Sequence, residues 1–295
     1  MTIKNRLLQI ASFFTSIFCG KKRFQIPEGY RIVHCDTFEK IKIGDYWMDW
    51  GDRGYLQTND LTAYWNNHDA MKVENHELVM WVEHKPLTWT MEQLPEYQRK
   101  EMNFHEIDGN PIPRVIDLFT QKDIDLATQN DIVSIPFVRG RLCSKNGYKH
   151  GIFKVDVMLP EGFNLHPSFW LCGIESWPPE IDMFEYYTKK DSIEPNVHYG
   201  DSHENHMHTR ATRISMRHKH DEWHEIVGWW EKDFIKIYYD GRLVYEVTDK
   251  NVLKWFDKEQ RVILTCSIDE WDIHEFTNKP TKQPVKYRNL EIYQK

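Results

Sequence analysis

The sequence predicts an all-β sandwich. Short apolar segments recur along the 295 residues, and Gly, Pro, Asn and Asp turn signals separate them. Helical periodicity is rare, and strands do not alternate with helices as they do in proteins with a parallel sheet. The length suits one large β domain. We therefore expect residues 24–295 to form a single domain of antiparallel sheets.

The first 23 residues have the layout of a signal peptide or of an apolar N-terminal extension. Lys4 and Arg6 precede a short apolar run over residues 7–19, as in a secretory signal. The run is too short for an ordinary membrane-spanning helix, and no other segment is apolar enough. We expect a secreted or cell-surface protein with no stable membrane span. A cytoplasmic location stays open.

The first elements are strands, followed by an insertion. Residues 31–38 predict the entry strand, and residues 71–82 alternate as a hairpin does. The strand pattern is lost around residues 85–130, where we expect a loop insertion with a short helix over 94–105 and a loop over 107–113. This insertion either walls a cleft or is a passive surface element.

Strands resume at residue 132 and continue to the C-terminus. Residues 154–159 alternate cleanly and end at a Pro-Glu-Gly turn. The clearest hairpin covers residues 234–247, where Asp240-Gly241 supplies a turn that needs positive φ. Residues 251–256 suit a short helix. The closing strands are expected over residues 261–266 and 287–293.

The most informative stretch is residues 177–187, with the sequence WPPEIDMFEYY. On a strand, Glu180 and Asp182 share one face. A β-bulge at Met183-Phe184 would return Glu185 to that face. Three crowded carboxylates raise at least one pKa, and a glycosidase needs one carboxylate as nucleophile and one carboxylic acid as proton donor. A solvated acidic edge or a calcium site are the alternatives.

This stretch resembles the bulged E-x-D-x-x-E signature of glycoside hydrolase family 16, the laminarinase, agarase and κ-carrageenase group. Three further blocks resemble family motifs in the same order: residues 148–162, 166–171 and 196–199. The resemblance runs from about Phe38 to Tyr293. It implies a concanavalin-like β-jelly roll of two curved antiparallel sheets, whose concave face would be the substrate cleft.

The resemblance also implies roles. Glu180 is expected to be the nucleophile, Glu185 the general acid/base, and Asp182 the residue that hydrogen-bonds the nucleophile. The implied reaction is retaining endo-hydrolysis of a β-linked polysaccharide by double displacement, with β-1,3-glucan, agar-type galactan and carrageenan all open as substrates. A transglycosylase on the same scaffold is one alternative. A non-catalytic glycan-binding module is another, although such relatives have typically lost an acid of the triple.

Further positions are candidates for sugar binding. Trp177 stands where the family places an aromatic platform, and His198 matches a histidine near the acid/base; a core Trp and a structural His are the alternatives. Trp170, in an apolar strand, is a weaker candidate. Arg141 and Asn205 are weaker cleft candidates as well.

His166 and Arg288 are among the positions that depart from the family pattern. His166 replaces the first Trp of a "WPAFW" block, so one common sugar platform is missing. Arg288 stands where many members have an Asp that helps to hold a structural calcium ion, and an arginine cannot ligate a hard cation. We therefore expect no cofactor, and a structural calcium is doubtful.

Composition and charge limit the partners. A net charge of -7 argues against nucleic acid, which needs a basic face. It also argues mildly against a highly sulfated polysaccharide, although a local basic cleft is compatible with it. The five cysteines are an odd number without close pairs in the sequence, so they do not predict a disulfide framework. The spacing of His203, His206 and His208 favours a solvated loop over a metal site. We expect a monomer.

Overall fold

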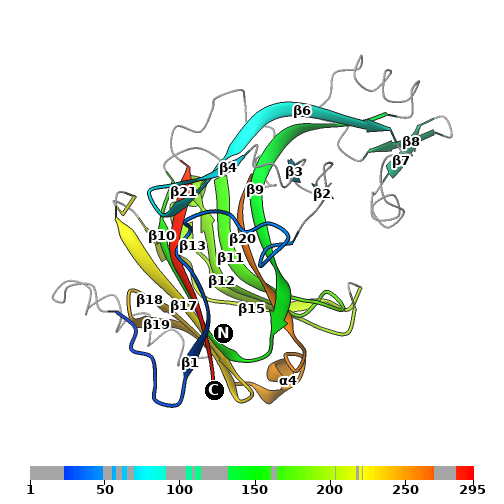
Figure 1. Cartoon of the computed structure of the whole chain (residues 1–295). Coiled ribbons are helices and arrows are strands. Elements are labelled where there is room, and N and C mark those ends of the chain that lie inside the picture. The colour runs from blue at the N-terminus through cyan, green and yellow to red at the C-terminus, as the bar shows by residue number, and fades with distance from the viewer. Residues whose placement is uncertain are drawn as a thin grey trace.

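The computed structural model describes residues 23–48, 55–57, 62–64, 70–90, 104–107, 110–113, 132–160, 165–202, 204–216, 219–220, 222–268 and 284–295. Two large sheets are layered on each other, and a small third sheet lies at the far end of the long strands (Figure 1). The predicted all-β jelly-roll sandwich is therefore confirmed.

The first sheet has eight strands in the order β19-β18-β17-β10-β21-β5-β4, and β1 also pairs with β21. These strands are β1 (Arg31–Asp36), β4 (Met71–Glu74), β5 (Glu77–Met80), β10 (Gly151–Met158), β17 (Trp223–Glu231), β18 (Phe234–Tyr239), β19 (Arg242–Val247) and β21 (Val285–Gln294). The predicted hairpins β4–β5 and β18–β19 are both present. Asp240 and Gly241 have φ values of 47° and 69°, as the predicted turn requires.

The second sheet has eleven strands, and its main path runs β15-β14-β12-β11-β20-β9-β3-β2. Its strands are β2 (Tyr55–Gln57), β3 (Thr62–Tyr64), β6 (Val82–Thr90), β9 (Ile132–Tyr148), β11 (Leu165–Gly173), β12 (Glu180–Tyr187), β13 (Ser192–Ile193), β14 (Asn196–Tyr199), β15 (Met207–Arg210), β16 (Ile214–Ser215) and β20 (Gln260–Ile268). A 3-10 helix, η3 (Thr188–Lys190), follows β12. The short helix α4 (Lys250–Leu253) begins with Asp249 as its N-cap and confirms the helix expected there.

The core lies between the two large sheets. Alternate residues of each strand point inward, so Leu171, Ile181 and Phe184 from the eleven-stranded sheet and Val155 and Ile226 from the eight-stranded sheet are fully buried. Burying such side chains contributes roughly 1.5–3 kcal/mol each relative to exposure. The other face of each strand is then free to carry polar chemistry.

The insertion differs from expectation. Strand β6 continues to Thr90 and pairs with β9, and β7 (Phe104–Ile107) forms a hairpin with β8 (Asn110–Pro113). The loop predicted over 107–113 is therefore wrong, because cross-strand pairing overrides a weak local pattern. Most of the helix predicted over 94–105 lies outside the described residues. In Figure 1 the long strands β6 and β9 bend away from the eight-stranded sheet and lead to this hairpin.

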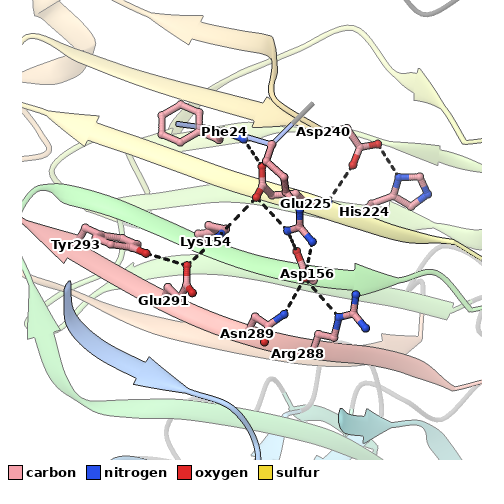
Figure 2. A network of polar contacts seen from close by, with 11 residues as sticks. Phe24, Lys154, Asp156, His224, Glu225, Asp240, Arg288, Asn289, Glu291 and Tyr293 are labelled. Atoms are coloured by element: carbon pink, nitrogen blue, oxygen red, sulfur yellow. Dashed lines mark hydrogen bonds and ion pairs between the residues drawn. The ribbon is translucent and has the colours of Figure 1, made fainter. Parts of the chain in front are cut away.

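A polar network covers the outer face of the eight-stranded sheet (Figure 2). Asp156 and Glu225 are neighbours in register and almost fully buried. Arg23 Nη1 lies 2.5 Å from Asp156 Oδ1 and 3.1 Å from Glu225 Oε2. Arg288 Nε lies 3.4 Å from Asp156 Oδ2, and Asn289 donates to the same oxygen at 2.9 Å. The N-terminal segment is thus tied to the sheet through buried carboxylates.

The described cysteines, which are Cys35, Cys143, Cys172 and Cys266, are free thiols. Within the described residues, no helix has the length and apolar character needed to cross a membrane. Residues 1–22, which hold the predicted signal or extension, lie outside the described part of the chain.

Candidate active site

The bulge that places three carboxylates on one face lies in β12. Across the pairing of β12 with β11, Phe184 faces Phe169, but Asp182 faces Trp170, so Met183 is the extra residue. The extra residue shifts the alternation by one position. Glu185 therefore joins Glu180 and Asp182 on the face turned away from the core, as the sequence predicts. We call this face of the eleven-stranded sheet the site face.

The extra residue fits because the facing strand leaves space for it. Met183 is fully buried, and a Cβ built on Gly228 of β17 would lie 2.2 Å from Met183 Sδ. Tyr239 Oη donates to the Met183 carbonyl at 2.9 Å, which satisfies a backbone group that the bulge removes from the ladder. The eight-stranded sheet thus supports the bulge from behind.

Glu180 is held by an indole and an imidazole. Trp177 Nε1 donates to Glu180 Oε2 at 3.0 Å. His198 faces Glu180 directly in the pairing of β12 with β14, and its Nε2 lies 3.6 Å from Glu180 Oε1 and 3.3 Å from Asp182 Oδ2. Trp177 and His198 therefore both belong to the site, where the sequence places them.

Both ring nitrogens of His198 are engaged. Asn196 Nδ2 lies 2.7 Å from His198 Nε2, and His206 Nε2 lies 2.6 Å from His198 Nδ1. The His198 and His206 rings stack with centroids 4.8 Å apart, and the Trp177 ring lies 4.7 Å from that of His206. Aromatic rings thus line the side of the site beyond Glu180, where they can pack against the face of a sugar.

Burial dominates the electrostatics of the acids. Burial raises the pKa of Glu180 well above its usual range, and the neighbouring Asp182 carboxylate raises it further, while His198 acts in the opposite direction. Burial and the charge of Glu185 likewise raise the pKa of Asp182, against a hydrogen bond with Glu180. These two side chains thus favour holding a proton between them.

The third acid has a different neighbourhood. Glu185 Oε1 lies 3.2 Å from Nε2 of His166 on β11. The His166 ring stacks on Tyr187, with centroids 4.5 Å apart and an interplanar angle of 18°, and Lys190 Nζ lies 4.6 Å from the Tyr187 ring. The residue that replaces the family's Trp therefore contacts the expected acid/base directly.

One group of described residues could hold a metal ion. Glu180, Asp182 and His198 each offer a ligand atom, and these atoms lie within 4.8 Å of one another. The group coincides with the acids expected to carry the reaction. Of the histidines considered as a metal site from the sequence, His203 lies outside the described residues, and the His206 and His208 rings lie 5.8 Å apart.

The weaker candidates Trp170, Arg141 and Asn205 do not all lie on the site face. Trp170 faces Asp182 across the strand pairing and is half-buried, and the Arg141 guanidinium lies 5.2 Å from the Trp170 ring centroid. Both are therefore on the site face. Asn205 is exposed in the turn between β14 and β15, where it bonds Asp201 and Ser202, so its described contacts lie away from the acids.

Sequence reasoning missed several residues of the site. His166, Asn196 and His206 contact the acids or His198, yet they were not chosen as site residues. The signal was available for Asn196, because it stands two positions before His198 on one strand and so shares its face. The position of His206 depends on the turn that reverses β14 into β15, which local pattern does not determine.

The profile of Glycosyl hydrolases family 16 matches residues 59–289. The chain belongs to glycoside hydrolase family 16. This membership makes it a glycoside hydrolase by class and confirms the resemblance seen in the sequence. A search of curated proteins found no match.

Solved structures of low sequence identity share the fold. SCLam, a non-specific endo-β-1,3(4)-glucanase from family GH16, is 19% identical and has a TM-score of 0.64, covering 94% of this chain and 95% of that one. LamAcat from Zobellia galactanivorans is 16% identical with a TM-score of 0.61, covering 89% and 97%. The laminarinase catalytic domain from Thermotoga maritima is 16% identical with a TM-score of 0.60, covering 91% and 99%.

Proposed function

We propose that this chain is a retaining endo-β-glycanase that cleaves a β-linked polysaccharide by double displacement. Glu180 is the nucleophile in this proposal. Its carboxylate attacks the anomeric carbon and forms a glycosyl-enzyme intermediate, which water then hydrolyses. The hydrogen bond from Trp177 and the nearby His198 support this role, since they hold one carboxyl group in a fixed orientation.

Glu185 is the proposed general acid and then the general base. It gives its proton to the departing sugar oxygen and later takes one from the attacking water. Asp182, whose pKa burial raises, takes up the proton that it shares with Glu180, so that Glu180 attacks as a carboxylate. The reaction needs no cofactor in this proposal.

The single observation that carries the proposal is the bulge at Met183. Without the extra residue, strict alternation would turn Glu185 into the core. A purely structural strand gains nothing from placing three like charges together. A binding module would not need Glu185 beside the other two acids.

The test is turnover on a panel of laminarin, lichenan, agarose, porphyran, κ-carrageenan and xyloglucan. We expect the wild type to release reducing ends from at least one glycan, and ¹H NMR of the first product to show the β-anomer. Products longer than the starting oligomer would identify a transglycosylase. Binding without turnover, unchanged in Glu180→Gln, would identify a binding module and refute the proposal.

A polymeric substrate also bears on location. A polysaccharide outside the cell reaches an enzyme that is secreted or displayed at the surface, so we propose that location for this chain. The check is the fate of residues 1–22 on secretion: a mature N-terminus beyond the apolar run supports it, and retention in the cytoplasm contradicts it.

A further inference from the structure

Glu180, Asp182 and His198 are spaced as the ligands of a metal ion are. His198 Nε2 lies 3.3 Å from Asp182 Oδ2 and 3.6 Å from Glu180 Oε1. In a tetrahedral site whose metal–ligand bonds are about 2.0–2.2 Å long, the ligand atoms lie about 3.3–3.6 Å from one another. The ligand atoms of all three residues lie within 4.8 Å of one another, so the rotation of one carboxylate completes this spacing.

One of these ligand atoms is buried without a hydrogen bond. Asp182 has a side chain that is only 4% exposed, and its Oδ2 accepts no hydrogen bond from the described part of the chain. Buried polar atoms are nearly always paired, so an unpaired carboxylate oxygen needs an explanation. This oxygen lies next to the nitrogen of His198 and near a second carboxylate, which is a position that a cation can fill.

Neighbouring side chains orient two of the ligands. A histidine that binds a metal through one ring nitrogen usually donates the N–H of the other to an acceptor. His198 Nδ1 lies 2.6 Å from His206 Nε2, which serves as this acceptor. In the same tautomer, Nε2 of His198 accepts from Asn196 Nδ2 at 2.7 Å, and a metal ion replaces that donor. Trp177 Nε1 holds Oε2 of Glu180 at 3.0 Å and leaves Oε1 for the ion.

The ligand set selects the class of metal. One imidazole nitrogen and two carboxylates, with a fourth position for water, are typical of zinc and of similar first-row divalent ions. Calcium takes six to eight oxygen ligands, and magnesium demands a nearly ideal octahedron of oxygens. Three ligands that include a nitrogen therefore favour a transition-metal ion over either of these.

We propose that a divalent transition-metal ion of the zinc type binds Glu180, Asp182 and His198 and reversibly inhibits the enzyme. This regulation rests on the proposed function, in which Glu180 is the nucleophile. A metal ion on Glu180 Oε1 occupies the lone pair that attacks the anomeric carbon, and it displaces the proton that Glu180 and Asp182 share. Removal of the ion by a chelator frees both carboxylates again.

The experiment titrates Zn²⁺ into the metal-free full chain by calorimetry, and Co²⁺ by visible absorbance. We expect one high-affinity Zn²⁺ per chain and the Co²⁺ spectrum of a tetrahedral site, whereas Ca²⁺ and Mg²⁺ should give no binding heat. On a glycan that the wild type cleaves, Zn²⁺ should lower turnover over the same concentration range in which it binds. EDTA should restore that turnover.

Variants separate this site from other histidines. Asp182→Asn and His198→Gln should each weaken Zn²⁺ binding by at least about tenfold, and either one tests the site if the other fails to fold. His206→Phe keeps a ring beside His198 but removes the acceptor of its Nδ1 proton, and should weaken binding about tenfold. The matched control is His208→Gln, which removes an exposed neighbouring histidine and should leave the Zn²⁺ affinity unchanged.

Three results would overturn the proposal: no Zn²⁺ binding, an affinity that stays unchanged in the ligand variants, or bound Zn²⁺ that leaves turnover unaffected. The outcome is separable from that of the proposed function, because calorimetry needs no turnover. Turnover without Zn²⁺ binding keeps the glycanase and refutes the metal site. Zn²⁺ binding that is lost in His198→Gln, by a wild type without turnover, keeps the metal site and refutes the proposed function.

Discussion

Glu180 combines burial with a charge that catalysis requires. Its raised pKa means that the folded state binds a proton more tightly than the unfolded chain. Ionisation therefore costs stability, and this cost grows as the pH rises above the ordinary carboxyl pKa near 4.5. Below that value the proton is bound in both states and no cost arises.

We predict that Glu180→Gln abolishes turnover and raises the melting temperature at pH 7, because a neutral amide replaces a group that is costly to ionise. The gain should disappear near pH 4. Thermal unfolding of both proteins at pH 4 and pH 7 measures this, with Asp201→Asn as an exposed control. A rise in melting temperature that is equal at both pH values would contradict the ionisation of buried Glu180 as its cause.

His166 contacts the proposed acid/base directly. Its Nε2 is 3.2 Å from Glu185 Oε1, and its ring stacks on Tyr187. We predict that His166→Phe keeps the stack, loses this contact, lowers kcat about tenfold and changes the pH profile. Tyr187→Phe is the matched control, because it keeps a ring under His166 and should leave the profile unchanged. A pH profile that is identical in His166→Phe and the wild type would show a purely steric role.

Individual residues also show how far sequence reasoning extends. Glu180, Asp182 and Glu185 could be placed on one face because alternation and one bulge suffice. Trp177 and His198 required the family pattern. His166 was recognised as a missing sugar platform, but its contact with Glu185 depends on the register between β11 and β12, which a single sequence does not determine.

At the scale of elements, the bulge in β12 depends on the strand behind it. Gly228 leaves the space that Met183 fills. We predict that Gly228→Val forces Met183 to move, costs about 1–3 kcal/mol and lowers kcat, because the acids shift with the bulge. Chemical denaturation and kinetics measure both effects. Gly228→Ala should have smaller effects on stability and on kcat. Adding Met183→Ala to Gly228→Val should recover stability, because the shorter side chain leaves room for the added valine. If stability does not recover, Met183 and Gly228 are not coupled.

The insertion shows the limit of element prediction. The sequence between 85 and 113 lacks strong alternation, yet β6, β7 and β8 are strands. Pairing with neighbouring strands stabilises these segments as strands, although their local strand propensity is weak. Hairpins with a defined turn, such as β18–β19, were predictable because Asp240-Gly241 fixes the connection locally.

At the scale of the molecule, the network around Asp156 ties Arg23, near the N-terminus, to Arg288, near the C-terminus (Figure 2). We predict that Asp156→Asn lowers the free energy of unfolding by about 1–3 kcal/mol, since it leaves these cations beside a neutral amide; their partial exposure keeps the value low. Urea denaturation measures this change in the free energy of unfolding. The control is Asp249→Asn at the N-cap of α4, for which we expect a change of about 1 kcal/mol or less. An unchanged midpoint would contradict a stabilising role.

The network around Asp156 argues against a structural calcium ion there, because arginine side chains contact this carboxylate. We therefore predict that EDTA leaves the melting temperature unchanged and that added calcium does not raise it. A shift of several degrees in either direction, reversed by the other reagent, would reveal a calcium site and contradict this expectation.

The roles of Glu180 and Glu185 are tested most directly by reducing-end release from the glycan panel, measured side by side for the wild type, Glu180→Gln and Glu185→Gln. We predict release by the wild type, with turnover lowered by about 10²–10⁴-fold in Glu185→Gln and lost in Glu180→Gln, while all three proteins stay folded. Full activity in either variant would contradict the assignment of these two residues as nucleophile and acid/base.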